Sequence, residues 1–126
     1  MSSTFRLSAV MFSMALFMAA SAYAQGPFDT SNGILVDESG MAVYTFDKDE
    51  GNSGTSNCYD NCAKNWPPVE ADADATAEGD YTIIERDDDT RQWAYQGKPL
   101  YTYAKDNKAG DMTGDEVGGV WRVVKQ

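Results

Sequence analysis

The stretch that decides the fold is residues 40–49, GMAVYTFDKD, because residues 97–106, GKPLYTYAKD, align with it without gaps. Five of the ten positions are identical, and two more exchange similar side chains. Each stretch is followed by a loop rich in glycine and aspartate and then by a tryptophan. Trp66 and Trp121 come 22 and 20 residues after the tyrosines of their stretches. These agreements, in the same order, indicate two copies of one structural unit.

The residues around the two stretches predict short antiparallel strands. In the first copy, β-branched and aromatic residues at 34–36 and 42–46 flank a tight turn that ends at Gly40. The second copy repeats this pattern around a turn that ends at Gly97. The strands expected from the patterns are 34–36, 42–46, 81–85, 92–95, 100–103 and 119–124. The sequence therefore predicts an all-β domain of two related β-hairpin units, with about six or seven strands and little helix.

Aromatic residues recur on one face of the second strand in each hairpin. Alternation along a strand places Tyr44 and Phe46 on the same face, and Tyr101 and Tyr103 repeat the arrangement. Eleven aromatic residues, three of them tryptophans, follow residue 24. We expect them to form the core, with the aromatic faces of the two units packed together. The alternative is a platform on which a sugar or another flat ligand stacks.

The first 24 residues have the features of a secretory signal peptide. One positive charge, Arg6, precedes an apolar run over 7–20, and Ala22-Tyr23-Ala24 ends the segment with the small residues that signal peptidase accepts. We expect cleavage after Ala24. The alternative is an uncleaved membrane anchor, although the run is shorter than the ~20 residues that span a bilayer. No cysteine lies near this site, so we expect a periplasmic or extracellular protein without a lipid anchor.

Cleavage would leave one small domain, residues 25–126, containing two repeats at about 32–69 and 81–124. The segment between them, residues 70–80, reads EADADATAEGD and predicts a solvated acidic connector. Without Arg6, nine basic residues stand against 20 acidic ones, a formal charge of −11. Acidity of this kind keeps a secreted domain soluble and repels anionic partners.

The chain contains no histidine, and its 10 Lys and Arg face 20 Asp and Glu. The lack of histidine excludes Ser-His-Asp and Cys-His catalytic sets, two-histidine metal centres and haem attached through a Cys-x-x-Cys-His motif. The excess of acid argues against a nucleic-acid partner, because that binding depends on clustered Lys and Arg. We therefore expect neither nucleic-acid binding nor catalysis.

Both copies contain a tyrosine, an aromatic residue two positions later and an aspartate three positions after that. The two sets are Tyr44, Phe46 and Asp49, and Tyr101, Tyr103 and Asp106. This Tyr-x-(Phe/Trp/Tyr)-x-x-Asp motif resembles that of a secreted bacterial repeat family, described as predicted lipoproteins of unknown function. The loop 58–62 and the endings at Trp66 and Trp121 also resemble it. The resemblance covers nearly all of the chain after the signal peptide and brings no established reaction.

Cys58 and Cys62 are the two cysteines of the chain and lie in a loop rich in glycine, asparagine and serine. In an oxidising compartment we expect a disulfide between them, which is worth only ~2 kcal/mol because the loop that it closes is short. An alternative is a redox-active pair, since a small ring can be strained and reducible. A zinc site is a further alternative, but two thiolates supply only half of its ligands.

Two loops that follow the aromatic strands contain candidate calcium ligands. These candidates are Asp47, Asp49, Asp106, Asp111 and Asp115. Calcium takes six to eight oxygen ligands and is available outside the cytoplasm. Neither loop has the order of an EF-hand, and aspartate and glycine also form ordinary solvated turns. We predict no cofactor, with calcium as the alternative.

Asp49 and Asp106 occupy the same position at the end of the motif in each copy. We expect each carboxylate to accept hydrogen bonds from backbone N–H groups of its loop and so to fix the turn. The alternative is a pair of carboxylates that share one cleft and perform acid/base chemistry, as in glycosidases.

We interpret the protein as an exported, monomeric, non-enzymatic binding or interaction module for an unknown envelope or extracellular partner. The Cys58–Cys62 loop would shape part of its surface. The alternative from a different class is an electron-transfer or redox accessory protein that uses this cysteine pair. A third reading is a calcium-binding secreted module.

Overall fold

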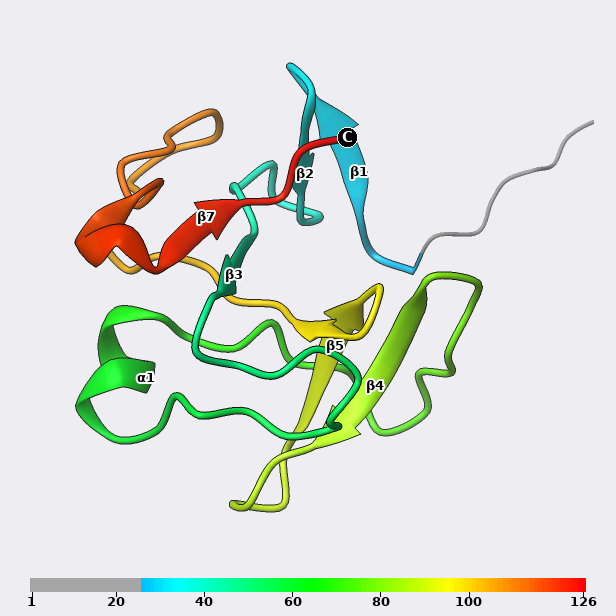
Figure 1. Cartoon of the computed structure of the whole chain (residues 1–126). Helices are drawn as coiled ribbons and strands as arrows, with labels where there is room; N and C mark the ends of the chain where they lie inside the picture. The colour runs from blue at the N-terminus through cyan, green and yellow to red at the C-terminus, as the bar shows by residue number, and fades with distance from the viewer. Residues whose placement is uncertain (1–25) are drawn as a thin grey trace, which may run out of the picture.

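The computed structural model describes residues 26–126, so the predicted signal peptide, residues 1–24, lies outside the described part of the chain. Short strands and two short helical pieces are joined by long loops (Figure 1). They are β1 (Asp29–Ser31), β2 (Ile34–Val36), β3 (Tyr44–Phe46), α1 (Asn61–Asn65), β4 (Tyr81–Glu85), β5 (Arg91–Tyr95), β6 (Lys98–Pro99), the 3₁₀ helix η1 (Val117–Gly119) and β7 (Trp121–Val123). The strands form three antiparallel sheets, β1–β2, β3–β7 and β4–β5–β6. The predicted all-β class with little helix is confirmed.

The β4–β5 hairpin forms where the sequence predicts it. Every residue of β4 pairs with β5, from Tyr81 opposite Tyr95 to Glu85 opposite Arg91. The chain then turns at Gly97 into β6, which extends the same sheet. In Figure 1 this sheet lies on one side of β3, and β1, β2 and β7 lie on the other.

The two glycines that mark the repeats adopt backbone conformations that suit glycine. Gly40 has φ +82° and Gly97 has φ +84°. A Cβ at Gly97 would collide with Asn52, and a Cβ at Gly40 would lie 3.0 Å from the Cβ of Ala109. Each turn therefore requires a residue without a side chain.

The first predicted hairpin is only partly formed. β2 pairs with β1 along its whole length, and its ladder to the strand after the turn is limited to a bridge between Val36 and Ala42. β3 pairs with β7, which sets Phe46 opposite Trp121. The prediction of a continuous hairpin in the first copy is therefore wrong. The second strand of the first copy pairs with the last strand of the second copy, because this pairing brings the aromatic residues of both copies into one core.

The interior contains two clusters of buried side chains. Neighbouring residues of one strand belong to different clusters. Tyr44, Phe46 and Tyr101 belong to one cluster, whereas the neighbouring Val43 and Leu100 belong to the other. This division follows the alternation that the sequence predicts. The first cluster also holds Trp66 and Trp121, so the aromatic residues of the two repeats do pack together.

Three further segments differ from the strand pattern read from the sequence. β1 and α1 were not expected, and 100–103 does not form a regular strand. Tyr101 instead makes isolated bridges to both Tyr44 and Pro68. Within residues 26–126, no helix is long and apolar enough to cross a membrane.

The connector between the repeats is mostly exposed, as expected, but it is held against β5. The N–H of Ala71 donates to the carbonyl of Arg91 at 2.9 Å. The guanidinium of Arg91 donates in turn to the carbonyls of Asp72, Ala73 and Ala75. These bonds give the connector a defined path over the sheet.

Candidate functional site

The motif tyrosine of each repeat is hydrogen-bonded to the motif aspartate of the other repeat. The Tyr44 hydroxyl donates to Asp106 Oδ2 at 2.7 Å, and the Tyr101 hydroxyl donates to Asp49 Oδ2 at 2.5 Å. All four residues are buried. The backbones of the two tyrosines also bond to each other, with N–H to carbonyl distances of 2.7 and 2.9 Å. The two copies are therefore joined by reciprocal contacts about one point, the Tyr44–Tyr101 bridge.

The other oxygen of each motif carboxylate binds the loop of its own repeat. Asp49 Oδ1 accepts the N–H of Asn57 at 2.7 Å, and Asp106 Oδ1 accepts the N–H of Thr113 at 2.9 Å. Each carboxylate therefore accepts a backbone N–H of its own loop, and its role in fixing that loop stays a prediction. Within residues 26–126 the two carboxylates have no hydrogen-bond partner in common, so the structure does not join them in one acid/base pair.

Four rings from the two repeats form one continuous stack, which we call the aromatic stack. Their order is Phe46, Trp121, Trp66 and Tyr103. Successive ring centroids are 4.1, 3.8 and 4.0 Å apart, and the two indoles are inclined by only 3°. Each repeat's tryptophan thus packs on the motif aromatic residue of the other repeat. This packing between repeats explains why a tryptophan follows the motif in each of them.

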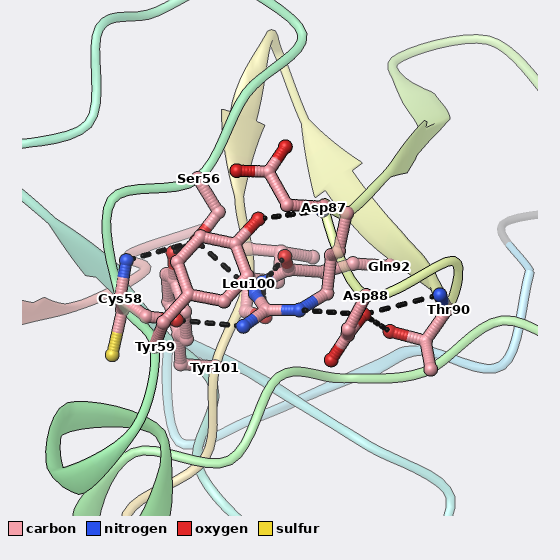
Figure 2. A network of polar contacts seen from close by, with 10 residues as sticks. Ser56, Cys58, Tyr59, Asp87, Asp88, Thr90, Gln92, Leu100 and Tyr101 are labelled. Carbon is pink, nitrogen blue, oxygen red and sulfur yellow. Dashed lines mark hydrogen bonds and ion pairs between the residues drawn. The ribbon is translucent and has the colours of Figure 1, made fainter.

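Arg86 is a buried cation beside the Cys58–Cys62 loop. Its Nη1 donates to Gln92 Oε1 at 2.8 Å and to Ser56 Oγ at 3.1 Å, and its Nη2 donates to the carbonyl oxygen of Cys58 at 2.6 Å (Figure 2). The guanidinium also lies 4.3 Å from the centroid of the Tyr59 ring. One buried side chain therefore ties the loop of the first repeat to the hairpin of the second.

The Arg86 network reaches one of the crossed tyrosine–aspartate pairs. Ser56 Oγ lies 2.6 Å from the Tyr101 hydroxyl, which donates to Asp49. Arg86 Nε is buried without a hydrogen-bond partner and lies 3.9 Å from a carboxylate oxygen of Asp88. The network is thus a chain of polar groups that crosses the interior (Figure 2).

The predicted disulfide between Cys58 and Cys62 is present. Cys58 is fully buried and belongs to the same cluster as Trp66, and Cys62 packs against that cluster. Asp60, between the two cysteines, has φ +56°, a conformation that side chains rarely adopt. The disulfide loop is therefore closely connected to the core. Redox activity of this pair stays a prediction.

The five calcium candidates are each engaged with donor groups of the protein. Asp49 and Asp106 bind the tyrosines, and Asp47 pairs with Arg122 at 2.8 Å. Asp111 accepts the N–H groups of residues 107 and 108, and Asp115 accepts the N–H of residue 123. Within residues 26–126, no three acidic or cysteine side chains are grouped so that they could hold a metal ion. Calcium binding stays a prediction without support from this arrangement.

A cavity of about 480 Å³, which we call the acidic cavity, opens where the segment before β1, the turn after β2 and the connector meet. Six carboxylates line it, together with Val69 and Trp93. They are Asp37, Glu38, Glu70, Asp72, Asp74 and Glu78. Of the residues that line the cavity, none is basic, and the ion pairs found within residues 26–126 involve none of these carboxylates. The cavity therefore gathers six carboxylates without an ion-pair partner among the described residues, while the guanidinium of Arg91 donates to the backbone carbonyls of Asp72 and Ala75.

The cavity and the buried arginine were both missed by the sequence patterns. The acidic composition of 70–80 indicated exposure, but not that the connector faces Asp37 and Glu38 across a cavity. Arg86 follows directly after an apolar strand in a chain with few basic residues, and this placement was the available signal.

Two aspartates of the first loop have pKa values that shift in opposite directions. Burial raises the pKa of Asp49, although Tyr101, Lys98 and Arg86 act against the rise. Arg122 lowers the pKa of Asp47. Asp49 therefore contributes stability below the ordinary aspartate pKa and loses it as the pH rises through its folded pKa. The contribution of Asp47 is present above the ordinary pKa and is lost as the pH falls.

Asp49→Asn and Asp47→Asn should accordingly change stability with opposite pH dependence. The free energy of unfolding in urea is measured at about pH 3 and pH 7 for both variants and the wild type. As the pH rises from 3 to 7, we expect the free energy of unfolding of the Asp49 variant to increase relative to that of the wild type. Over the same range, that of the Asp47 variant should decrease relative to the wild type. If the stability of both variants changes in the same direction, burial is not the main cause of the shifted pKa of Asp49.

The comparisons with known proteins agree with this two-part arrangement. The family model of a secreted repeat of unknown function matches the chain twice, at residues 26–70 and 82–125. No curated protein and no solved structure matches the chain. The description of the family as secreted supports export. The two matches cover both sets of crossed contacts, and the chain belongs to this family of secreted repeats.

Proposed function

We propose that the protein is an exported, non-enzymatic binding module whose acidic cavity takes a positively charged segment of an envelope or extracellular partner. The single observation that carries the proposal is the acidic cavity itself. Its volume, about 480 Å³, falls within the range of ligand sites. Its carboxylates come from two separate parts of the chain, the turn after β2 and the connector, which the fold brings together.

Electrostatics support a cationic ligand. Five of the six carboxylates belong to exposed residues, and Asp37 is half-buried. Neighbouring like charges repel one another, and a bound cation relieves this repulsion. Each contact with an exposed carboxylate is worth only about 0.2–1 kcal/mol and weakens with added salt. Several contacts are therefore needed, which favours a ligand that carries more than one positive charge.

The remaining wall of the cavity is apolar. Val69 and Trp93 line it beside the carboxylates. Lysine and arginine side chains pack their aliphatic stems against such surface while the charged ends reach polar groups. A basic peptide segment fits this combination of apolar wall and acidic rim.

Binding of a fluorescent oligolysine peptide, followed by anisotropy at low salt, tests the proposal. The test variant is the triple substitution Glu70→Gln/Asp72→Asn/Asp74→Asn, which removes three carboxylates of the cavity whose side chains are exposed. Three contacts of about 0.5 kcal/mol each correspond to roughly a tenfold rise in Kd. We expect this rise, and we expect the wild-type affinity to fall as salt is added.

A matched variant separates the cavity from the overall charge. Glu50→Gln/Glu85→Gln/Asp87→Asn removes three exposed carboxylates that do not line the cavity, so it changes the net charge equally. Its Kd should remain close to that of the wild type. Equal weakening in both triple variants would show that the peptide responds only to net charge, and the proposal would then fail.

A further inference from the structure

Binding at the acidic cavity makes no use of the buried aromatic and carboxylate groups at the centre of the molecule. Tyr44 and Tyr101 are fully buried, and each phenol donates to a buried carboxylate. A neutral acceptor such as a backbone carbonyl would satisfy a phenol at lower cost, because burying a carboxylate is unfavourable. Here the second oxygen of each carboxylate also accepts a loop N–H, and the same buried pair is repeated in both halves.

Each of these tyrosines also touches the aromatic stack. The ring of Tyr44 meets Trp66 edge-on with centroids 5.2 Å apart, and the ring of Tyr101 meets Trp121 in the same way at 5.1 Å. The two indoles between them are stacked at 3.8 Å. Four oxidisable rings therefore form a continuous series, and each end of the series is a phenol with a carboxylate already bound to its proton.

The aromatic stack has one accessible oxidisable end. Tyr103 is half-buried, whereas Trp66 and Trp121 are each only 5 % exposed. At the other end stands Phe46, also buried, whose ring is much harder to oxidise than a phenol or an indole. An oxidant in solution therefore meets the series at Tyr103, which lies 4.0 Å from Trp66.

We propose that these rings form a one-electron relay in which Tyr44 and Tyr101 are oxidised with transfer of their protons to Asp106 and Asp49. A one-electron oxidant, such as an oxidised metal complex, approaches at Tyr103 and takes one electron from the Trp66 indole across the Tyr103 ring, so that Tyr103 keeps its proton. The Trp66 radical cation then receives an electron from a motif tyrosine, directly from Tyr44 or through Trp121 from Tyr101. The phenol proton passes to the bonded carboxylate, which leaves a neutral tyrosyl radical and a carboxylic acid. A one-electron reductant reverses each step.

The pKa values of the two phenols indicate that each proton moves to its carboxylate only when the phenol is oxidised. Burial and the hydrogen bond to Asp106 raise the pKa of Tyr44, and burial and the hydrogen bond to Asp49 raise that of Tyr101. Both phenols therefore keep their protons until an electron is removed. Burial also raises the pKa of Asp49, which makes this carboxylate a stronger proton acceptor. The sequence suggested electron transfer through the disulfide, whereas the relay proposed here uses the aromatic rings.

Flash oxidation of the full chain with photogenerated ruthenium(III) tris-bipyridine tests the relay, with tyrosyl and tryptophanyl radicals followed by transient absorption. In Asp49→Asn/Asp106→Asn the amide oxygen can still accept a hydrogen bond but is a very weak base. We expect tyrosyl formation to slow by roughly 100-fold, the lower range of a general-base contribution, with the radical remaining on tryptophan. The matched variant Asp47→Asn/Asp111→Asn removes two aspartates of the same loops that bind no tyrosine and should behave as the wild type.

Two further measurements keep the test decisive if the buried variant folds poorly. In the wild type, tyrosyl formation should be slower in D₂O than in H₂O, because a proton moves with the electron. Tyr44→Phe/Tyr101→Phe should abolish the long-lived tyrosyl signal, whereas Tyr59→Phe/Tyr95→Phe, at tyrosines outside the relay, should retain it. A wild type without a solvent isotope effect, or a signal that depends on Tyr59 and Tyr95, would overturn the proposal.

Discussion

Replacing Trp66 with alanine is expected to lower the free energy of unfolding by about 4 kcal/mol, the usual cost of removing a large buried aromatic side chain. Trp66 is 5 % exposed and stacks on Trp121 and Tyr103 at 3.8 and 4.0 Å. Its removal leaves a cavity between residues of the two repeats. For a domain of this size the loss corresponds to a fall in Tm of about 20 °C, measured by calorimetry or circular dichroism.

Trp66→Phe is the matched control for this prediction. Phenylalanine keeps an aromatic face between Trp121 and Tyr103, so we expect a loss clearly smaller than that of the alanine variant. If both variants lose the same stability, the stacked geometry makes no special contribution. If neither loses more than about 1 kcal/mol, the aromatic stack is not the core that joins the repeats.

Arg86→Met should have the second largest effect, a loss of about 3 kcal/mol in the free energy of unfolding. The substitution removes the Nη donors to the carbonyl of Cys58 and to the side chain of Gln92, and both acceptors lie in the interior. Each buried acceptor without a partner costs about 1–3 kcal/mol. Urea unfolding measures the loss, and we expect the disulfide loop to exchange its amide hydrogens faster.

Arg91→Met provides the comparison for Arg86. Arg91 is a half-buried arginine nearby, and its three acceptors are carbonyls of the largely exposed connector. Water replaces a donor to such groups, so the expected loss is about 1 kcal/mol or less. A loss in this variant as large as that of Arg86→Met would mean that burial of the Arg86 network adds nothing.

The sequence predicted the parts of the fold that depend on local pattern. Alternation assigned Tyr44 and Phe46 to one face, and turn residues located the β4–β5 hairpin. The repeat itself marked Gly40 and Gly97, which both have positive φ. These features depend only on residues that are close together in the chain.

Contacts between distant residues could not be read from the same patterns. The Tyr44–Asp106 and Tyr101–Asp49 bonds join residues 62 and 52 positions apart. Each repeat, considered alone, offers its own tyrosine and aspartate as partners, and nothing in local pattern distinguishes this arrangement from the exchanged one. The pairing of β3 with β7 was missed for the same reason.

Other segments carried too little pattern to be predicted. β1 has three exposed residues and thus no alternation between apolar and polar side chains. α1 is five residues long, which is shorter than the window in which helical periodicity becomes visible. The acidic cavity was hidden because its carboxylates are gathered from the turn after β2 as well as from the connector.

The crossed bonds of Tyr44 and Tyr101 make each repeat half of a unit. One repeat by itself would bury a phenol without an acceptor, a carboxylate without its phenol, and an indole without the ring on which it stacks. A second, identical copy would supply all three through a symmetric interface. The chain is thus arranged like a homodimer whose two subunits are joined covalently. The disulfide of the first repeat and Arg86 of the second, which donates to the carbonyl of Cys58, are departures from this symmetry.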